Sequence, residues 1–368
     1  KNREENKERE SSFEVQITVG DKFYAYGFSV VLSKRKIMSE WLYELYQNGT
    51  ARCLFEREGN KRPILDSTIT LSNTEKNKFE IYADDFEGNE SSLFLTEMNR
   101  GKKYTVRSKL LFFKEVYDWI ENHIAVITPN TPLIDLEYYY DADSLKLINK
   151  LIETFDTGIS KVKIEEISLD ELSNAMPKPV FDKVMHHVKS RIEEQENPSF
   201  RMTMRSNESF FNIEVQGHEE PKVTTIRLNH VKSFYDFGFE EESDGTRRLF
   251  DLMDMLLNKR EDMLYVVDEL ERSLHPKLTE RFLQLFMQLH NEERMQLLFT
   301  THESSIMDQS IFRRDEIWFI ERNGKNASEI YSLDRFKERY DKVLSKAYLD
   351  GRYGAIPVFS TFEFRGEE

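Results

Sequence analysis

Hydrophobic and polar residues alternate along the first part of the chain, which predicts antiparallel β structure. Every second residue from Phe13 to Val19 is apolar, and the turn Gly20-Asp21 leads into an extended segment from Phe23 to Leu32. Glycine-containing turns separate three more predicted strands, Trp41–Tyr46, Cys53–Glu58 and Ile64–Ile69. We therefore expect β structure from Phe13 to about Leu95.

The middle of the chain combines helical and extended patterns. Apolar residues at helical spacing predict an amphipathic helix over Leu110–Ile124 and another that Asp141 or Asp143 caps and that extends to Phe155. Pro177 and Pro179 precede a further predicted helix, through Val184 to Ile192. Shorter apolar segments predict strands at Phe200–Met204, Phe211–Val215 and Val223–Leu228. The sequence has no long heptad repeat, which argues against an extended coiled coil.

In the final third, apolar strands alternate with helices. The predicted order is helix Gly245–Leu257, strand Met263–Val267, helix Pro276–His290, strand Met295–Phe299, a helix from Ser304, and strands Ile317–Ile320 and Ile330–Leu333. Such alternation is typical of a parallel sheet covered on both faces. In these sheets functional groups gather at the carboxyl ends of the strands.

Composition and charge narrow the class of protein. The chain has 368 residues, 39% of them hydrophobic, which allows two or three units with substantial cores. The net charge of -15 argues against a generic basic groove for nucleic acid but leaves a local basic patch open. Cys53 is the only cysteine, which excludes a disulfide framework and favours a reducing compartment. No apolar run reaches the roughly 20 residues of a membrane helix, so we expect a cytoplasmic protein without a membrane partner.

Two carboxylates end the apolar strand Met263–Val267. Asp268 and Glu269 would cost desolvation energy at a strand end unless a cation or a reaction uses them. In a nucleotide hydrolase the first carboxylate holds Mg²⁺, and the second orients and deprotonates the attacking water. The alternative is a strand that runs into a solvated acidic loop.

A second polar cluster follows the strand Met295–Phe299. It consists of Thr300, Thr301 and His302. The histidine could contact a γ-phosphate or position a water molecule. Alternatively, it is a loop residue that only caps the next helix.

A third cluster, Glu242–Arg248, lies immediately before a predicted helix. Ser243 or Asp244 at the N-cap, followed by Gly245, suits an anion site at a helix N-terminus. Arg247 and Arg248 add charge that a phosphate could use. Helix capping alone also explains the serine and the aspartate.

The order of these clusters resembles the ABC ATPase head shared by SMC, RecF and OLD proteins. The corresponding segments are Ser243-Asp244-Gly245-Thr246 for the signature loop, Asp268-Glu269 for the Walker B pair, Ser273-Leu274-His275-Pro276 for the D-loop and His302 for the switch histidine. Glu242–Leu249, Asp268–Pro276 and Gly351–Pro357 are most similar to RloA-like AAA family ATP-binding proteins of bacterial defence islands. The resemblance is strong over about Phe237–Phe359 and diffuse before it.

This resemblance implies an α/β fold, an ABC-ATPase head with three parts. We expect an N-terminal antiparallel β-rich lobe over 1–125, a mixed helical/β insertion over 126–240, and a C-terminal lobe over 241–368 with a RecA-like parallel sheet half. It also implies ATP and Mg²⁺ as cofactors and a head-to-head dimer or higher homo-oligomer. Two heads would enclose two nucleotides, and the signature loop of one would contact the γ-phosphate held by the other.

The resemblance also assigns roles to residues. Asp268 would serve the metal, Glu269 would be the general base, and His302 would sense the γ-phosphate. The nucleotide-binding residues would be Ser243, Asp244, Gly245, Thr246, Arg247 and His275.

One part of the pattern is missing. Gly-Lys-Ser and Gly-Lys-Thr do not occur, and the pairs Gly101-Lys102 and Gly324-Lys325 lack the glycine-rich loop of a P-loop. Either the P-loop precedes Lys1 in a longer polypeptide, as we expect, or nucleotide binding has been lost.

Three functions fit these observations. The first is an ATPase that acts as sensor or scaffold in anti-phage, abortive-infection defence, controls a separate toxin or nuclease subunit, and responds to a phage protein or DNA. The second is a RecF-like DNA-binding repair ATPase, against which the acidic charge counts mildly. The third is a nucleotide-free interaction module that has kept the fold.

Overall fold

The computed structural model describes residues 7–129, 137–205, 209–258, 260–291, 294–325, 327–337 and 343–357. The chain forms two compact units, Lys1–Ala125 and Val126–Glu368. Hydrophobic clusters lie within each unit. No helix in the described ranges is both long and apolar enough to cross a membrane.

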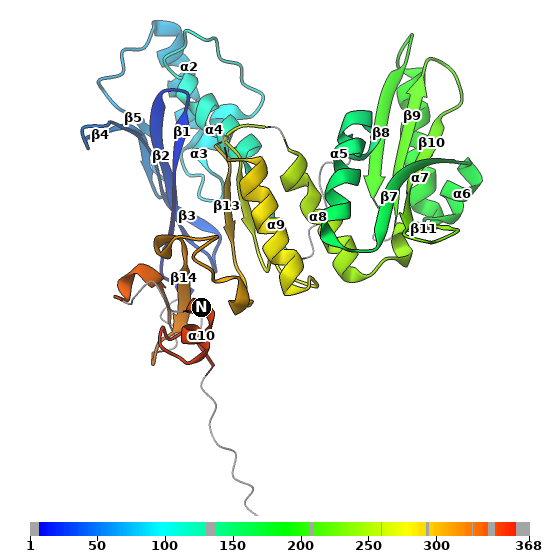
Figure 1. The fold of residues 1–368 in the computed structure, drawn as a ribbon. Coiled ribbons are helices and arrows are strands. Elements are labelled where there is room, and N and C mark those ends of the chain that lie inside the picture. Colours follow the sequence, from blue (N-terminus) through cyan, green and yellow to red (C-terminus); the bar gives the residue numbers. More distant parts are fainter. Residues whose placement is uncertain are drawn as a thin grey trace, which may run out of the picture. The chain divides into compact units, whose positions relative to one another are not determined.

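Five antiparallel strands form the sheet of the first unit, in the order β1-β2-β3-β4-β5 (Figure 1). The strands are β1 (Ser11–Val19), β2 (Lys22–Val31), β3 (Lys36–Leu45), β4 (Ala51–Glu58) and β5 (Ile64–Leu65). The alternation in the sequence therefore predicts the first four strands well. The fifth is shorter than expected.

The expectation of β structure up to Leu95 is wrong, because two helices follow β5. They are α2 (Asn73–Phe86) and α3 (Phe94–Asn99). Ser72 and Glu75 form a capping box that starts α2. The buried side chains of Phe79, Ala83 and Phe86 then lie on one face of the helix.

Helix α4 (Leu111–His123), which the sequence predicts, completes the core of this unit. Aromatic rings join the helices to the sheet. Phe55 of β4 lies 5.8 Å from Phe94 and 5.0 Å from Phe113, measured between ring centroids. All three side chains are fully buried, so α2, α3 and α4 share one core with the sheet.

A buried carboxylate holds the start of α3. The cap residue Leu93 offers no side-chain hydrogen bond. Instead, Glu40 of β3 accepts hydrogen bonds from the backbone N–H groups of Phe94 at 2.7 Å and Leu95 at 2.9 Å. Arg57 lies 3.5 Å from the same carboxylate, and both side chains are inaccessible to solvent.

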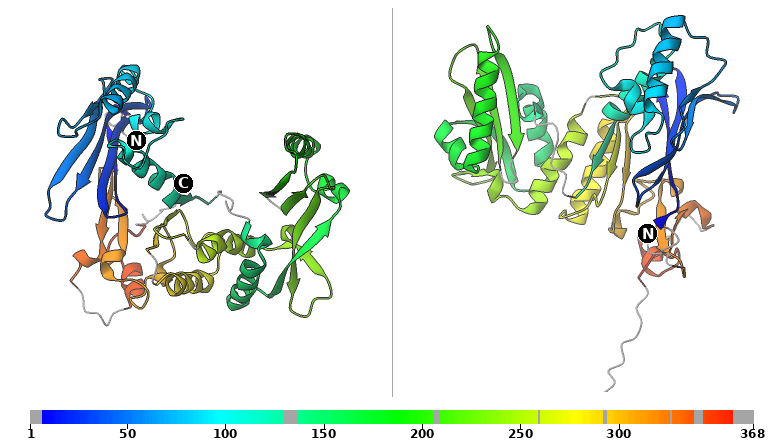
Figure 2. Two further views of the ribbon diagram at one scale, coloured as in Figure 1. Left: turned by 90° about the horizontal axis from the view of Figure 1, so that it is seen from above. Right: turned by 180° about the vertical axis from the view of Figure 1, so that it is seen from behind.

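The second unit begins with a mixed helical and β region (Figure 1 and Figure 2). Its helices are η1 (Glu137–Tyr140), α5 (Ala142–Ile152), η2 (Glu153–Phe155), α6 (Leu169–Asn174), α7 (Lys178–Glu193) and η3 (Phe239–Glu241). Its strands are β7 (Ile159–Ile167), β8 (Ser199–Arg205), β9 (Phe210–Gln216), β10 (Lys222–His230) and β11 (Asp236–Gly238). β10 is central and pairs antiparallel with β7, β9 and β11. The sequence predicted α5, α7, β8, β9 and β10 but not β7, β11 or α6.

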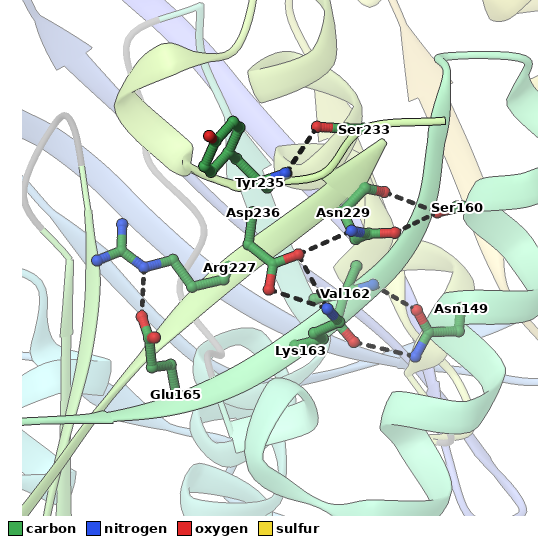
Figure 3. A network of polar contacts seen from close by, with 10 residues as sticks. All are labelled: Asn149, Ser160, Val162, Lys163, Glu165, Arg227, Asn229, Ser233, Tyr235 and Asp236. Carbon is green, nitrogen blue, oxygen red and sulfur yellow. Dashed lines mark hydrogen bonds and ion pairs between the residues drawn. The ribbon is translucent and has the colours of Figure 1, made fainter. Parts of the chain in front are cut away.

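Polar side chains tie β7, β10 and β11 together (Figure 3). Lys163 donates to both carboxylate oxygens of Asp236 at 2.9 Å, and Asn229 donates to Asp236 at 2.8 Å. On the helical side, the Asn149 amide of α5 bonds to the backbone of Val162 in both directions. This network fixes the end of β10, from which the chain continues toward Ser243.

A further three-stranded sheet has the order β13-β12-β6. Its elements are β6 (Ile124–Ile127), α8 (Asp244–Leu257), β12 (Leu264–Val267), α9 (Pro276–Leu289) and β13 (Gln296–Phe299). β12 and β13 pair in parallel, as the alternating pattern predicts.

Two expectations for the C-terminal part are wrong. The segment Ile317–Ile320 does not extend the parallel sheet, because β14 (Trp318–Arg322) pairs antiparallel with β15 (Ser328–Ser332) across a tight turn. The helix from Ser304 is a single turn, η4 (Ser304–Ile306). Asp308 accepts a hydrogen bond from the backbone N–H of Ser310, a turn that ends this helix.

The last described elements are η5 (Arg314–Glu316), η6 (Leu333–Arg335) and α10 (Leu344–Leu349). Leu333 of η6 and Leu344 and Ala347 of α10 form a small core with Phe319 and Tyr353. The Tyr331 hydroxyl donates to the backbone oxygen of Tyr353 at 2.7 Å, which joins β15 to the segment Gly351–Pro357.

Candidate functional site

Asp268 and Glu269 lie at the carboxyl end of β12, beside the end of β13. Thr300 follows β13 and bridges the two residues. Its hydroxyl donates to Asp268 Oδ1 at 2.6 Å and accepts the backbone N–H of Glu269 at 2.9 Å. The Asp268 N–H donates to the backbone oxygen of Ile127 at 2.9 Å. Thr300 therefore orients the Asp268 carboxylate, and hydrogen bonds of their backbone N–H groups hold Asp268 and Glu269 beside the ends of β6 and β13.

The backbone turns sharply after β12. Glu269 has a φ of 50° and Ser273 a φ of 63°, both in the left-handed region that side chains other than glycine rarely occupy. Strained backbone of this kind is concentrated at functional sites. The turn brings Glu269 Oε1 to 4.0 Å from His302 Nε2. The His302 side chain is 88% exposed and that of Glu269 43% exposed, so solvent reaches both groups.

Glu271 connects this turn to His302. Its Oε1 accepts the backbone N–H of His302 at 2.8 Å. Its other oxygen, Oε2, is buried and has no hydrogen-bond partner among the described residues. The sequence interpretation assigned roles to neither Thr300 nor Glu271, because both act through contacts 31 or 32 residues away.

The predicted signature loop begins α8. Ser243 is the N-cap residue, and its Oγ accepts the Thr246 N–H at 3.1 Å and lies 3.0 Å from Thr246 Oγ1. Asp244 accepts from Arg247 at 2.6 Å. Ser243 and Asp244 are exposed, whereas Thr246 is buried. The capping prediction for Ser243 is therefore confirmed.

Gly245 brings this loop against the D-loop segment of the same chain. A Cβ atom at Gly245 would lie 2.7 Å from the backbone oxygen of Ser273, closer than real Cβ contacts allow. Only glycine fits between the start of α8 and this backbone. The signature loop and the D-loop segment are thus packed together within one chain.

Arg248 extends from α8 toward the acidic turn. Its side chain is buried, and burial lowers the pKa of its guanidinium. Nη2 lies 3.5 Å from the backbone oxygen of Glu269, while Nε and Nη1 have no hydrogen-bond partner in the described part of the chain. The helix that carries the signature loop therefore approaches the turn that carries Glu269.

His275 has a local role. Its Nδ1 accepts the Lys277 N–H at 3.2 Å and caps α9, where Pro276 occupies the first turn. Its ring is exposed to solvent. This arrangement leaves the other ring nitrogen accessible to a ligand.

Upstream of the signature loop, a second acid–histidine pair links β10 to α8. His230 Nε2 lies 2.5 Å from Glu242 Oε1, and the Glu242 side chain is only 6% exposed. Aromatic packing continues this link, because Phe239 contacts both Phe210 of β9 and Phe250 of α8. The mixed region and the helix of the signature loop thus share side-chain contacts.

A metal would find few protein ligands here. Across the described residues, no group of three or more His, Cys, Asp or Glu side chains could hold a metal ion. Mg²⁺, however, is commonly bound by one or two carboxylates together with substrate phosphates and water. A single carboxylate such as that of Asp268 fits this pattern, in which phosphates and water supply the remaining metal ligands.

The two Gly-Lys pairs do not form a P-loop. Lys102 follows Gly101 but pairs with Glu97 at 2.6 Å. Gly324 lies in the turn between β14 and β15. Neither pair lies between a strand and the start of a helix, where a P-loop binds phosphate.

Comparisons with known proteins give one family match and distant similarities to solved structures. Residues 2–308 match the model of a family described as "AAA domain, putative AbiEii toxin, Type IV TA system". One similar solved structure is an SmcHead bound to the C-winged helix domain of ScpA, with 10% identity, a TM-score of 0.29, and coverage of 85% of this chain and 74% of that chain. Another is an Smc head domain with an extended coiled coil bound to the C-terminal domain of ScpA derived from Pyrococcus furiosus, with 9% identity, a TM-score of 0.26, and coverage of 85% of this chain and 77% of that chain. None of the curated proteins matches the chain. The family match extends over parts of both structural units.

Proposed function

Since this chain belongs to the AAA domain family that its residues 2–308 match, a family of ATPases, we propose that it binds and hydrolyses ATP as an ABC-type head. The observation that carries this proposal is the meeting of Asp268, Glu269 and His302 at one edge of the β13-β12-β6 sheet. The bridging hydroxyl of Thr300 orients the carboxylate that would serve the metal.

The roles follow from the chemistry of each group. Asp268 would hold Mg²⁺, which neutralises phosphate charge when it is bound. Glu269 would accept a proton from the attacking water, and solvent reaches its carboxylate. His302, 4.0 Å from Glu269, would contact the γ-phosphate. The strained turn at Glu269 would aim these groups at one nucleotide.

A second copy of the chain would complete the site. Ser243 and Asp244 are exposed at the N-terminus of α8, where backbone N–H groups and the helix dipole favour an anion. With Gly245, Thr246, Arg247 and His275 they would contact the nucleotide of the facing head. The close contact of Gly245 with Ser273 would link this loop to the D-loop of its own head.

Phosphate binding also requires a P-loop. We propose that a segment outside the printed sequence supplies it. β13 is an outer strand of its sheet among the described residues, so its edge can pair with a further strand. Such a strand would deliver its glycine-rich loop to the sheet edge that holds Asp268 and His302.

For the biological role, we propose a cytoplasmic ATPase that senses infection in anti-phage defence and controls a separate toxin or nuclease subunit. Support comes from the family description and from the similarity of Glu242–Leu249 and Asp268–Pro276 to defence-associated proteins. The head would act as a homo-oligomer and respond to a phage protein or to DNA.

ATP turnover by the full-length protein tests the proposal. We expect hydrolysis that requires Mg²⁺ and stops in EDTA. If the full-length protein fails to bind ATP, the result would instead favour the third function, a nucleotide-free interaction module.

A further inference from the structure

The loop between α3 and α4 concentrates positive charge in an otherwise acidic protein. From Met98 to Lys114 the sequence has six Lys or Arg residues and no Asp or Glu, whereas the whole chain has 52 basic and 67 acidic residues. Like charges on one loop repel one another. Such a cluster is therefore typical of a surface that meets an anion.

Two of these cations are neutralised within the protein. Lys102 pairs with Glu97 at 2.6 Å, and Lys114 pairs with Asp118 at 2.7 Å. The other four, Arg100, Lys103, Arg107 and Lys109, are exposed and have no ion pair with any described residue. Lys76 on the adjoining helix α2 is likewise exposed and has no ion pair among the described residues. We call these five residues the basic loop.

The basic loop is held in place by α2. Lys78 donates to the backbone oxygen of Lys103 at 3.0 Å. Glu75 accepts from the Ser108 hydroxyl and from the Lys109 N–H, both at 2.8 Å. The one carboxylate that touches the loop from α2 is thus engaged by hydrogen bonds, and the loop backbone is fixed before any ligand binds.

We propose that the basic loop binds the phosphate backbone of duplex DNA without sequence preference. Several unpaired cations along one loop match the repeated charges of a duplex. The only aromatic ring in the loop, Tyr104, is half-buried and lies 4.6 Å from the Lys78 ammonium. It therefore offers no stacking platform of the kind that single strands require.

A lipid surface fits the basic loop less well. Interfacial binding needs apolar area in addition to positive charge. Val106, 88% exposed, is the only large apolar side chain exposed in this loop, and a single valine buries little area. Duplex DNA needs no apolar anchor.

The test measures binding of the full chain to a labelled duplex by fluorescence anisotropy, without nucleotide, from 50 to 200 mM salt. Five phosphate contacts predict a slope of log K against log salt of about -4 to -5. Replacing Lys103, Arg107 and Lys109 by Gln should reduce the slope by about 3 and weaken binding about 10²–10³-fold at 100 mM salt.

The control triple variant is Lys22→Gln, Lys34→Gln and Lys61→Gln. It changes the net charge equally, but these lysines pair with Glu115, Glu8 and Glu58. We expect its affinity to stay within about twofold, because exposed ion pairs contribute little.

Three results would overturn the proposal. They are no duplex binding at 50 mM salt, an equal loss in the control variant, and tighter binding to a single strand or to anionic phosphatidylserine vesicles than to the duplex. Melting temperatures of both variants verify folding. Because no ATP is added, the outcome is independent of whether the protein hydrolyses ATP.

Discussion

Glu271 and His302 are joined by a hydrogen bond from the His302 backbone N–H to Glu271 Oε1, 2.8 Å long. Glu271 lies two residues beyond Glu269, in the turn after β12, whereas His302 follows β13. The backbone position of the histidine therefore depends on a side chain from the turn that carries the proposed general base. We regard Glu271 as a positioning residue.

We expect Glu271→Ala to free the His302 backbone. Loss of a hydrogen bond to a charged group costs about 1–3 kcal/mol, so local opening should become about 5- to 150-fold more frequent. Hydrogen–deuterium exchange of a peptide that contains His302 measures this change. Glu271→Gln retains an acceptor oxygen and should give a smaller effect. Equal exchange in the wild-type protein and in Glu271→Ala would refute the positioning role.

Glu269→Gln tests the general base. The amide keeps the shape of the side chain but cannot accept a proton from water. We expect ATP binding to be intact and hydrolysis to fall about 10²–10⁴-fold. Glu280→Gln on α9 is a matched control, because Glu280 pairs with Lys277 and should leave turnover unchanged. Unchanged turnover in Glu269→Gln would remove Glu269 from the role.

Gly245→Ala tests the contact between the signature loop and the D-loop segment. The new methyl group would lie 2.7 Å from the Ser273 backbone oxygen, and backbone cannot move aside cheaply. We expect a loss of about 1–3 kcal/mol in the free energy of unfolding, measured by urea denaturation, and a fall in ATP turnover. Gly324→Ala is the control, because nothing lies within 4 Å of its added Cβ. Equal stability of the two variants would contradict the contact.

Periodicity and capping predicted much of the fold from the sequence. The alternation from Phe13 onward gave the first strands, and Ser243 and Asp141 are N-caps as expected. The helices α2 and α3 were missed. The buried face of α2 has only three residues, and Glu40, which holds α3, is more than 50 residues away in the sequence. Local patterns do not contain such distant partners.

The candidate site was predictable to a similar extent. Asp268, Glu269 and His302 end apolar strands, which is a local signal. Thr300 and Glu271 act through side-chain contacts between separate strand ends, which appear only when β12 and β13 pair. The segment Ile317–Ile320 is a continuous apolar run, like a buried parallel strand, and it lies at the start of β14. Only its tertiary pairing with β15 excludes it from the main sheet.

Glu40→Ala should destabilise the first unit strongly. The change removes the acceptor for two N–H groups of α3 and leaves the Arg57 charge buried without its partner. Breaking a buried ion pair in this way costs about 3–5 kcal/mol. Thermal or urea unfolding measures the loss. Glu40→Gln keeps an acceptor oxygen and should cost less, and a loss below about 1 kcal/mol in Glu40→Ala would contradict the capping role.

Glu75 should make the free energy of unfolding depend on pH in the acidic range. Burial alone would raise the pKa of its carboxyl, but hydrogen bonds from Ser72, Ser108 and the Lys109 N–H outweigh this and lower the pKa to about 2. The folded state therefore binds fewer protons than the unfolded state, whose pKa is near 4.5. The stabilisation is fully present above pH 4.5 and is lost as the pH falls toward 2.

The comparison of wild type with Glu75→Gln isolates this contribution. Urea unfolding at pH 6 should show the variant less stable by about 1 kcal/mol, the usual value for a helix cap. The difference should shrink steadily between pH 4.5 and pH 2, because protonation of Glu75 removes the charge that the variant already lacks. Glu87→Gln, just beyond the end of α2, serves as the control. A difference that stays constant over this range would show that the Glu75 charge contributes nothing.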